Sequence, residues 1–188
     1  MGTLSSWFRN VEMRKELRMK RLIEEDYITA EGFRAVVLFN HRSGSRCGYI
    51  FVPESNKAYV EPTYKKIKFA EKERDVMNYE VYDLEVNGGV TYGENAVAEN
   101  DYPAQTDDKG TWLGWDYAHC DDTPDFDKWE TLIETDEDRA TFDVYKSMDH
   151  SSMGYPCHMW TQDEVKAECD SASRQLYIMT KGKLDEEY

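Results

Sequence analysis

The sequence has few cysteines, no long apolar segment and little positive charge in its second half. Four of its 188 residues are cysteine (Cys47, Cys120, Cys157 and Cys169), and none forms a CxxC pair, unlike a disulfide framework or a zinc ribbon. The longest apolar run, residues 35–39, is far shorter than the ~20 residues that cross a bilayer. The first residues also lack the apolar stretch of a signal peptide, because charged residues recur every few positions. We therefore expect reduced thiols, no membrane contact and a cytoplasmic location.

Negative charge is concentrated beyond residue 80. Residues 1–80 contain 15 Lys/Arg and 12 Asp/Glu, whereas residues 81–188 contain 8 and 26. An acidic half repels phosphate backbones but suits docking on a basic protein surface or holding a metal ion. Residues 94–149 carry 17 acids and 4 bases. This composition favours a basic protein partner over nonspecific nucleic-acid binding, and it identifies no reaction.

The N-terminal region predicts an amphipathic, basic helix. Ser5 and Ser6 are suitable N-cap residues, and residues 7–25 repeat apolar and basic positions at three-to-four spacing. We interpret residues 1–30 as an N-terminal helical extension and residues 31–188 as a single α+β domain. The basic face of the helix is either solvated or a contact for a partner such as RNA.

Alternating apolar residues predict a mostly antiparallel sheet. The predicted strands are residues 34–40, 46–53, 79–87 and 111–118. The lysine-rich stretch 65–79 is interpreted as either a surface helix or an extended connector. The acid-rich stretch 121–149 contains enough aromatic residues to dock on the core rather than remain disordered.

The C-terminal region contains the clearest helix signal. Thr161 and Glu164 have the spacing of a capping box, and apolar residues follow at helical spacing. The sequence therefore predicts a helix from Gln162 to about Tyr177. We expect this C-terminal helix to pack on one face of the sheet, which gives an α+β fold.

The segment from Trp112 to Asp122 holds the densest group of chemically active residue types. A turn after Asp116 would bring Asp116 and His119 together with Asp121 or Asp122 at a strand end. That arrangement serves general acid–base catalysis or a carboxylate and imidazole metal site. The alternative is structural: His119 caps the strand while it is hydrogen-bonded to a nearby aspartate.

A Gly-Gly turn provides a second candidate site. Gly88 and Gly89 allow positive φ and a close approach of backbone N–H groups to a ligand, although an Asn-Gly turn between two strands explains the same residues. Adjacent pairs such as His119 with Cys120 rarely bind one zinc ion together, so we expect no bound metal and no cofactor unless the protein is a Mg²⁺-dependent nuclease. The candidate binding residues are Gly88, Gly89, Thr91, Tyr92, Trp112, Trp115, Asp121 and Asp122.

Three segments together resemble a known group of proteins. They are Gly88-Gly89-Val90-Thr91-Tyr92, then Trp112-x-Gly114-Trp115-Asp116-x-Ala118-His119-x-x-Asp122, then Trp160-Thr161-x-x-Glu164-Val165-x-x-Glu168-Cys169. With the run Cys47-Gly48-Tyr49-x-x-Val52-Pro53, this pattern resembles a family of small proteins encoded by bacteriophages and mobile elements, over residues 47–176. Asn87 stands where that family often has a histidine. The resemblance implies a viral accessory function, such as blocking a host defence.

Three functions follow as hypotheses. The first is an anti-CRISPR protein that binds a Cas9-type host effector through its acidic surface in the host cytoplasm. The second is a metal-dependent hydrolase or nuclease, cleaving RNA for example, in which Asp116 and His119 are catalytic. The third is a sponge that sequesters a nucleotide immune signal between the Gly-Gly turn and aromatic rings.

Overall fold

The computed structural model describes residues 21–60, 63–69, 72–77, 82–95, 102–148, 151–152 and 155–185. Five strands form one antiparallel sheet in the order β1-β2-β3-β7-β6: β1 (Arg21–Ile28), β2 (Arg34–Asn40), β3 (Ser45–Pro53), β7 (Gly110–Asp116) and β6 (Tyr92–Asn95). Two-stranded pairs are formed by β4 (Tyr64–Phe69) with β5 (Lys72–Met77), and by β8 (Ser151–Ser152) with β9 (Tyr155–Pro156). The helices are α2 (Phe126–Glu130), α3 (Asp136–Ser147) and α4 (Gln162–Asp185).

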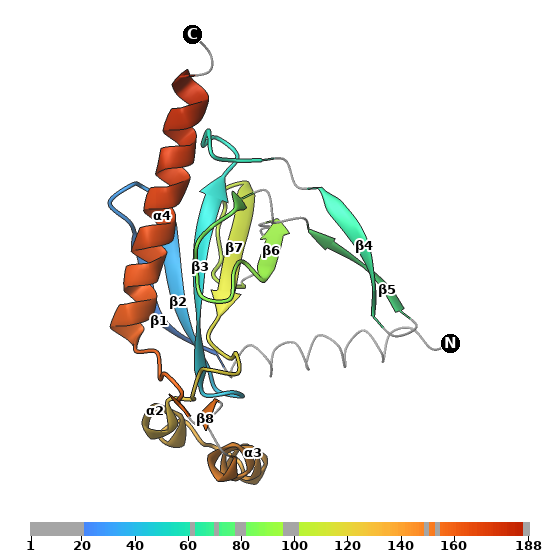
Figure 1. Cartoon of the computed structure of the whole chain (residues 1–188), viewed down its shortest axis with the longest axis vertical. Helices are drawn as coiled ribbons and strands as arrows, with labels where there is room; N and C mark the ends of the chain where they lie inside the picture. The colour runs from blue at the N-terminus through green and yellow to red at the C-terminus, as the bar shows by residue number, and fades with distance from the viewer. Residues whose placement is uncertain are drawn as a thin grey trace.

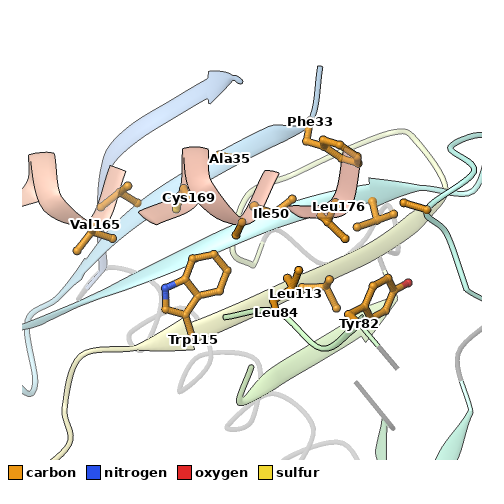
Figure 2. Close-up of a cluster of buried hydrophobic side chains, with 14 of the residues drawn as sticks. Phe33, Ala35, Ile50, Tyr82, Leu84, Leu113, Trp115, Val165, Cys169 and Leu176 are labelled. Carbon is orange, nitrogen blue, oxygen red and sulfur yellow. The ribbon is translucent and has the colours of Figure 1, made fainter. Parts of the chain in front are cut away.

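Helix α4 lies along one face of the sheet, as predicted (Figure 1). Val165, Cys169, Ala172 and Leu176 follow at helical spacing, and each is fully buried. Figure 2 shows Val165, Cys169 and Leu176 directed at residues of the sheet, and Ala172 belongs to the same buried cluster. This shared apolar stripe holds the helix against the sheet. The α+β fold with an antiparallel sheet and a C-terminal helix is therefore confirmed.

The predicted capping box starts α4. The Thr161 backbone N–H donates to Glu164 Oε2 at 2.8 Å, and the Glu164 N–H donates to Thr161 Oγ1 at 3.3 Å. The hydrogen bond from the Thr161 backbone lowers the pKa of the Glu164 carboxyl. The helix extends to Asp185, beyond the predicted end near Tyr177.

The opposite face of the sheet has its own apolar cluster. Val36, Leu38, Tyr49, Phe51, Ala104 and Trp112 are buried there. Trp115 belongs to the cluster beneath α4, whereas Trp112 belongs to this one. Successive side chains of β7 point to opposite faces of the sheet, so the two rings, three residues apart, lie on opposite faces. Both are 1% exposed.

Helices α2 and α3 form a lobe at one end of the sheet (Figure 1). We name residues 121–148 the acidic lobe. Phe39 from β2, Trp129 from α2 and Phe142 from α3 are buried together. The Trp129 and Phe142 rings meet edge to face, with centroids 5.4 Å apart. The prediction that aromatic residues dock this acid-rich stretch is confirmed.

A buried ion-pair network joins the lobe to the sheet. Glu24 lacks a Cα partner where the register of β1 shifts between Ile23 and Glu25. Its carboxylate accepts from Arg46 Nε at 2.8 Å, with 1% of the Glu24 side chain and 5% of the Arg46 side chain exposed. Arg46 also pairs with Asp125 at 2.9 Å and donates to the Trp160 carbonyl at 2.7 Å. One guanidinium thus connects β1, the N-cap of α2 and the residues before α4.

Three sequence predictions need correction. Residues 21–25, predicted as the end of a helix, are part of β1, because this strand pairs with β2. Residues 7–20 of the predicted helix lie outside the described part of the chain. Of the predicted strand 79–87, residues 82–87 alternate but form no strand, and residues 79–81 lie outside the described part of the chain. The lysine-rich stretch contains the paired antiparallel strands β4 and β5, so of its two interpretations the surface helix is wrong. The predicted boundary between an N-terminal extension and the domain, at residue 30, stays a prediction. Strand β1, which precedes this boundary, is part of the five-stranded sheet.

The Arg46 network predicts a large stability effect. Arg46→Met keeps an aliphatic stem but leaves the buried Glu24 carboxylate without its guanidinium, so unfolding by urea should show a loss of about 3–5 kcal/mol. The matched control is Arg139→Met, because Arg139 pairs with Glu130 at the surface, where both side chains are nearly half exposed. Its cost should be at most about 1 kcal/mol. Similar stabilities for the two variants would contradict the assigned role of Arg46.

Candidate functional site

The candidate site is built around a turn that follows β7. The Asp122 N–H donates to the His119 carbonyl at 3.1 Å, which closes the turn. Residue 122 then forms a parallel bridge with residue 158, shortly before α4. This geometry brings residues 87–91, 116–122 and 158–168 together. We name Asn87, His119, Asp122 and Trp160 the Asp122 cluster.

Asp122 is the central acceptor of this cluster. Its side chain is 3% exposed. Oδ2 accepts from the His119 backbone N–H at 2.8 Å and contacts His119 Nδ1 at 3.2 Å, while Oδ1 accepts from Trp160 Nε1 at 2.7 Å. A buried carboxylate is stabilised by hydrogen-bond donors. Because Nδ1 of His119 faces the Asp122 carboxylate, we assign the proton of a neutral His119 ring to Nδ1, where it can be donated to Oδ2. Nε2 is then left as the basic ring nitrogen.

Asn87 links the turn to the preceding loop. Its side-chain amide lies 3.4 Å from both Asp122 Oδ2 and the Asp116 carbonyl, and 3.3 Å from His119 Nδ1. With the proton on Nδ1, the amide donates to the two oxygens rather than to the ring. Asn87 therefore fixes the loop beside His119.

The His119 ring packs directly on the Gly-Gly turn. Gly88 and Gly89 have φ of +66° and +79°, in the left-handed region that favours glycine. A Cβ on Gly88 would lie 2.2 Å from Cε1 and Nε2 of His119, whereas a Cβ on Gly89 would meet nothing within 4 Å. Gly88 therefore serves both the turn and the close approach of the imidazole.

Glu168 of α4 forms hydrogen bonds to residues next to and within the Asp122 cluster. Oε2 accepts from Trp115 Nε1 at 2.8 Å and from the Tyr117 hydroxyl, and Oε1 accepts from the Asn87 backbone N–H at 3.1 Å. Burial, and then the hydrogen bond to Glu168, raise the pKa of Tyr117 above its ordinary value. The Tyr117 hydroxyl thus remains a protonated donor, and the three bonds hold the loop, β7 and α4 in one arrangement.

Asp116 and His119, the predicted catalytic pair, have different partners. Asp116 Oδ2 accepts from Thr91 Oγ1 at 3.3 Å, and Oδ1 accepts from the Ala118 N–H at 3.1 Å. The carboxylate bonded to His119 is that of Asp122. Asp116 therefore holds the turn after β7 at Ala118 and the preceding loop at Thr91.

The predicted binding residues do not form one surface. Gly88, Thr91 and Asp121 are exposed, and Gly89 and Tyr92 are partly exposed, whereas Asp122 is buried. Trp112 and Trp115 are buried in clusters on opposite faces of the sheet. The two tryptophan rings are therefore unavailable to stack on a nucleotide in this structure.

A pocket of about 250 Å³ lies next to the Asp122 cluster. It is lined by Ser43, Ser45, Tyr117, Ala118, His119, Cys120, Asp122, Thr123, Pro124, Tyr145, Met148 and Cys157. Its walls come from the β2–β3 turn, the turn after β7 and the end of α3. Within the described part of the chain, no group of three His, Cys, Asp or Glu residues is placed to hold a metal ion.

Sequence reasoning missed several residues of this site. Trp160 and Glu168 lie 41 and 49 residues beyond His119, and only the fold brings them to it. Glu168 follows Glu164 by four residues in the predicted helix, so both lie on one helix face. That spacing was the one available signal, and it does not identify Trp115 and Tyr117 as the partners.

Comparisons of the chain with protein-family models, with curated proteins and with solved structures gave no match. The described helices include none that is long and apolar enough to cross a membrane.

The Gly-Gly turn predicts different outcomes for two neighbouring substitutions. Gly88→Ala and Gly89→Ala both place an L side chain at positive φ, which costs roughly 1–2 kcal/mol, but only Gly88→Ala also collides with His119. We expect Gly88→Ala to lose more stability in urea unfolding and to shift the NMR resonances of the His119 ring. Equal losses with unchanged His119 resonances would contradict the packing described here.

Proposed function

We propose that the protein is a binding protein that docks on a basic surface of another protein through its acidic lobe. The partner is a bacterial defence effector of the Cas9 type, whose nucleic-acid channel is basic, and the protein acts as its inhibitor in the host cytoplasm. The resemblance to phage and mobile-element proteins supports this choice of partner. The observation that carries the proposal is the unbalanced negative charge on the outside of the lobe.

The basic residues of the lobe are already engaged. The lobe contains 10 acidic and 3 basic residues. Lys128 pairs with the buried Glu24, and Arg139 and Lys146 both pair with Glu130. Six acids are exposed and form no ion pair among the described residues: Asp121, Asp127, Glu134, Asp136, Glu137 and Asp143. Their field is therefore directed outward, which steers a basic partner and makes its association sensitive to salt.

Not every acid of the lobe belongs to this surface. Asp122 is enclosed by His119 and Trp160. Asp125 caps α2 by accepting from the Lys128 N–H, and it pairs with Arg46. Replacing either one would disturb the fold as well as the charge. A test of docking should therefore use Asp127, Glu134 and Asp143.

A second candidate function rests on His119 itself. Its ring is one-third exposed, is oriented by a buried carboxylate and borders the pocket. A histidine held in this way can act as a general base in hydrolysis. Metal-dependent cleavage by Asp116 and His119 has less support, because these residues have separate partners. The nucleotide sponge has the least support, since it relies on the buried Trp112 and Trp115.

The docking proposal predicts that exposed acids of the lobe, and not exposed acids elsewhere, set the association rate with the partner. Glu54, Asp107 and Asp108 are exposed acids near the far end of β3, away from the lobe, and provide a control with the same change in charge. Changing the lobe trio to amides should slow association with a guide-loaded Cas9-type effector about tenfold or more at low salt and flatten its salt dependence. The control trio should have a much smaller effect. Association rates measured at several salt concentrations give the comparison.

The same assay separates the two candidate functions. A binding inhibitor should retain its activity in His119→Gln, provided that this variant remains folded. Inhibition that survives the lobe substitutions but is abolished by His119→Gln would overturn the docking proposal and favour chemistry at His119.

A further inference from the structure

Two thiols from distant parts of the chain meet at the pocket. Cys120 lies in the turn after β7 and is exposed, and Cys157 lies before α4 and is partly exposed. Both line the same pocket. The Cys157 thiol donates to the Cys120 carbonyl, with Sγ and O 3.5 Å apart. Both residues are therefore accessible to solvent, and the Cys157 thiol lies against the Cys120 backbone.

Backbone hydrogen bonds hold the two segments side by side. The Thr123 N–H donates to the His158 carbonyl at 2.9 Å, and the His158 N–H donates to the Asp121 carbonyl at 2.9 Å. The parallel bridge pairs Asp122 with His158, so Cys120 lies one residue out of register with Cys157. Segments bridged in this way run about 4.8 Å apart, and disulfides join Cα atoms about 4.4–6.8 Å apart. Forming a disulfide requires the exposed Cys120 side chain to turn its sulfur toward Cys157.

We propose that Cys120 and Cys157 form a thiol modification site that closes to an intramolecular disulfide in the presence of a small disulfide such as oxidised glutathione. One thiolate attacks the small disulfide, forms a mixed disulfide and releases one glutathione thiolate. The second cysteine, as its thiolate, then attacks the protein sulfur of the mixed disulfide, which forms the Cys120–Cys157 bond and releases the other glutathione as its thiolate. The protein loses two electrons and two protons, and the small disulfide is reduced to two thiols.

This bond would close the base of the acidic lobe. Residues 120–157 contain all of α2 and α3, so the disulfide constrains the unfolded chain on both sides of the lobe. The inference does not depend on the function of the lobe. Cys169 supplies an internal control, because it is fully buried and burial raises the pKa of its thiol to about 12. A protonated thiol of this kind does not attack disulfides.

The test equilibrates the native full-length protein with glutathione buffers of increasing oxidation, alkylates the remaining thiols and maps peptides by mass spectrometry. We expect a peptide pair linked through Cys120 and Cys157 and an alkylated Cys169. The oxidised protein should also unfold several degrees higher than the reduced protein. Cys120→Ser and Cys157→Ser should each stop at a mixed disulfide with glutathione on the remaining cysteine.

Two results would overturn the proposal. One is wild-type protein that accumulates glutathione on Cys120 or Cys157 without forming the linked pair. The other is a linked pair that appears only in dimers or involves Cys47. Near-UV circular dichroism of both serine variants checks that each is folded, so a lost crosslink reports on the thiol rather than on misfolding.

Discussion

The arrangement of this protein depends on one buried guanidinium. Arg46 contacts Glu24 from β1, Asp125 from the N-cap of α2 and the Trp160 carbonyl before α4. Removing these charges from water is costly, and only well-aligned partners offset that cost. Arg46 and Lys128 also lie over the Phe39 ring, 5.3 Å and 5.4 Å from its centroid. The network thus fixes where the acidic lobe and the start of α4 sit relative to the sheet.

This constraint separates the charges of the lobe into an inner and an outer set. The inner set includes Asp125 and Lys128, which form ion pairs with Arg46 and Glu24 and so hold the lobe to the sheet. The outer set, such as Glu134 and Asp143, is exposed and unpaired among the described residues. A lobe fixed in this way presents its field in one orientation, which suits electrostatic docking on a preformed basic surface. Figure 1 shows this lobe at the end of the sheet, away from the β4–β5 hairpin.

The sequence predicted those parts of the fold that local patterns determine. Strands β2, β3 and β7 are apolar on both faces, and the capping box at Thr161 marks the start of α4. Strand β1 was missed because its charged residues resemble a helix surface, and nothing local reveals that Glu24 is turned inward to Arg46. Residues 82–86 alternate because one side is buried, yet alternation alone does not supply a hydrogen-bonding partner.

The site was predictable to a similar extent. His119 does lie beside Gly88 and an aspartate, but the turn at 119–122 selects Asp122 rather than Asp116. Trp160 and Glu168 complete the cluster through long-range packing, which no spacing in the sequence specifies. The acid-rich composition identified the lobe, whereas only the fold distinguishes acids that are exposed from those that cap and pair.

The most direct test of the account is a hydrogen-exchange footprint of the full-length protein, free and bound to a guide-loaded Cas9-type effector. The account predicts that binding slows amide exchange in α2 and α3, with little change at residues 87–91. Protection limited to residues 87–91 and 117–122, with unchanged exchange across α2 and α3, would contradict docking through the acidic lobe.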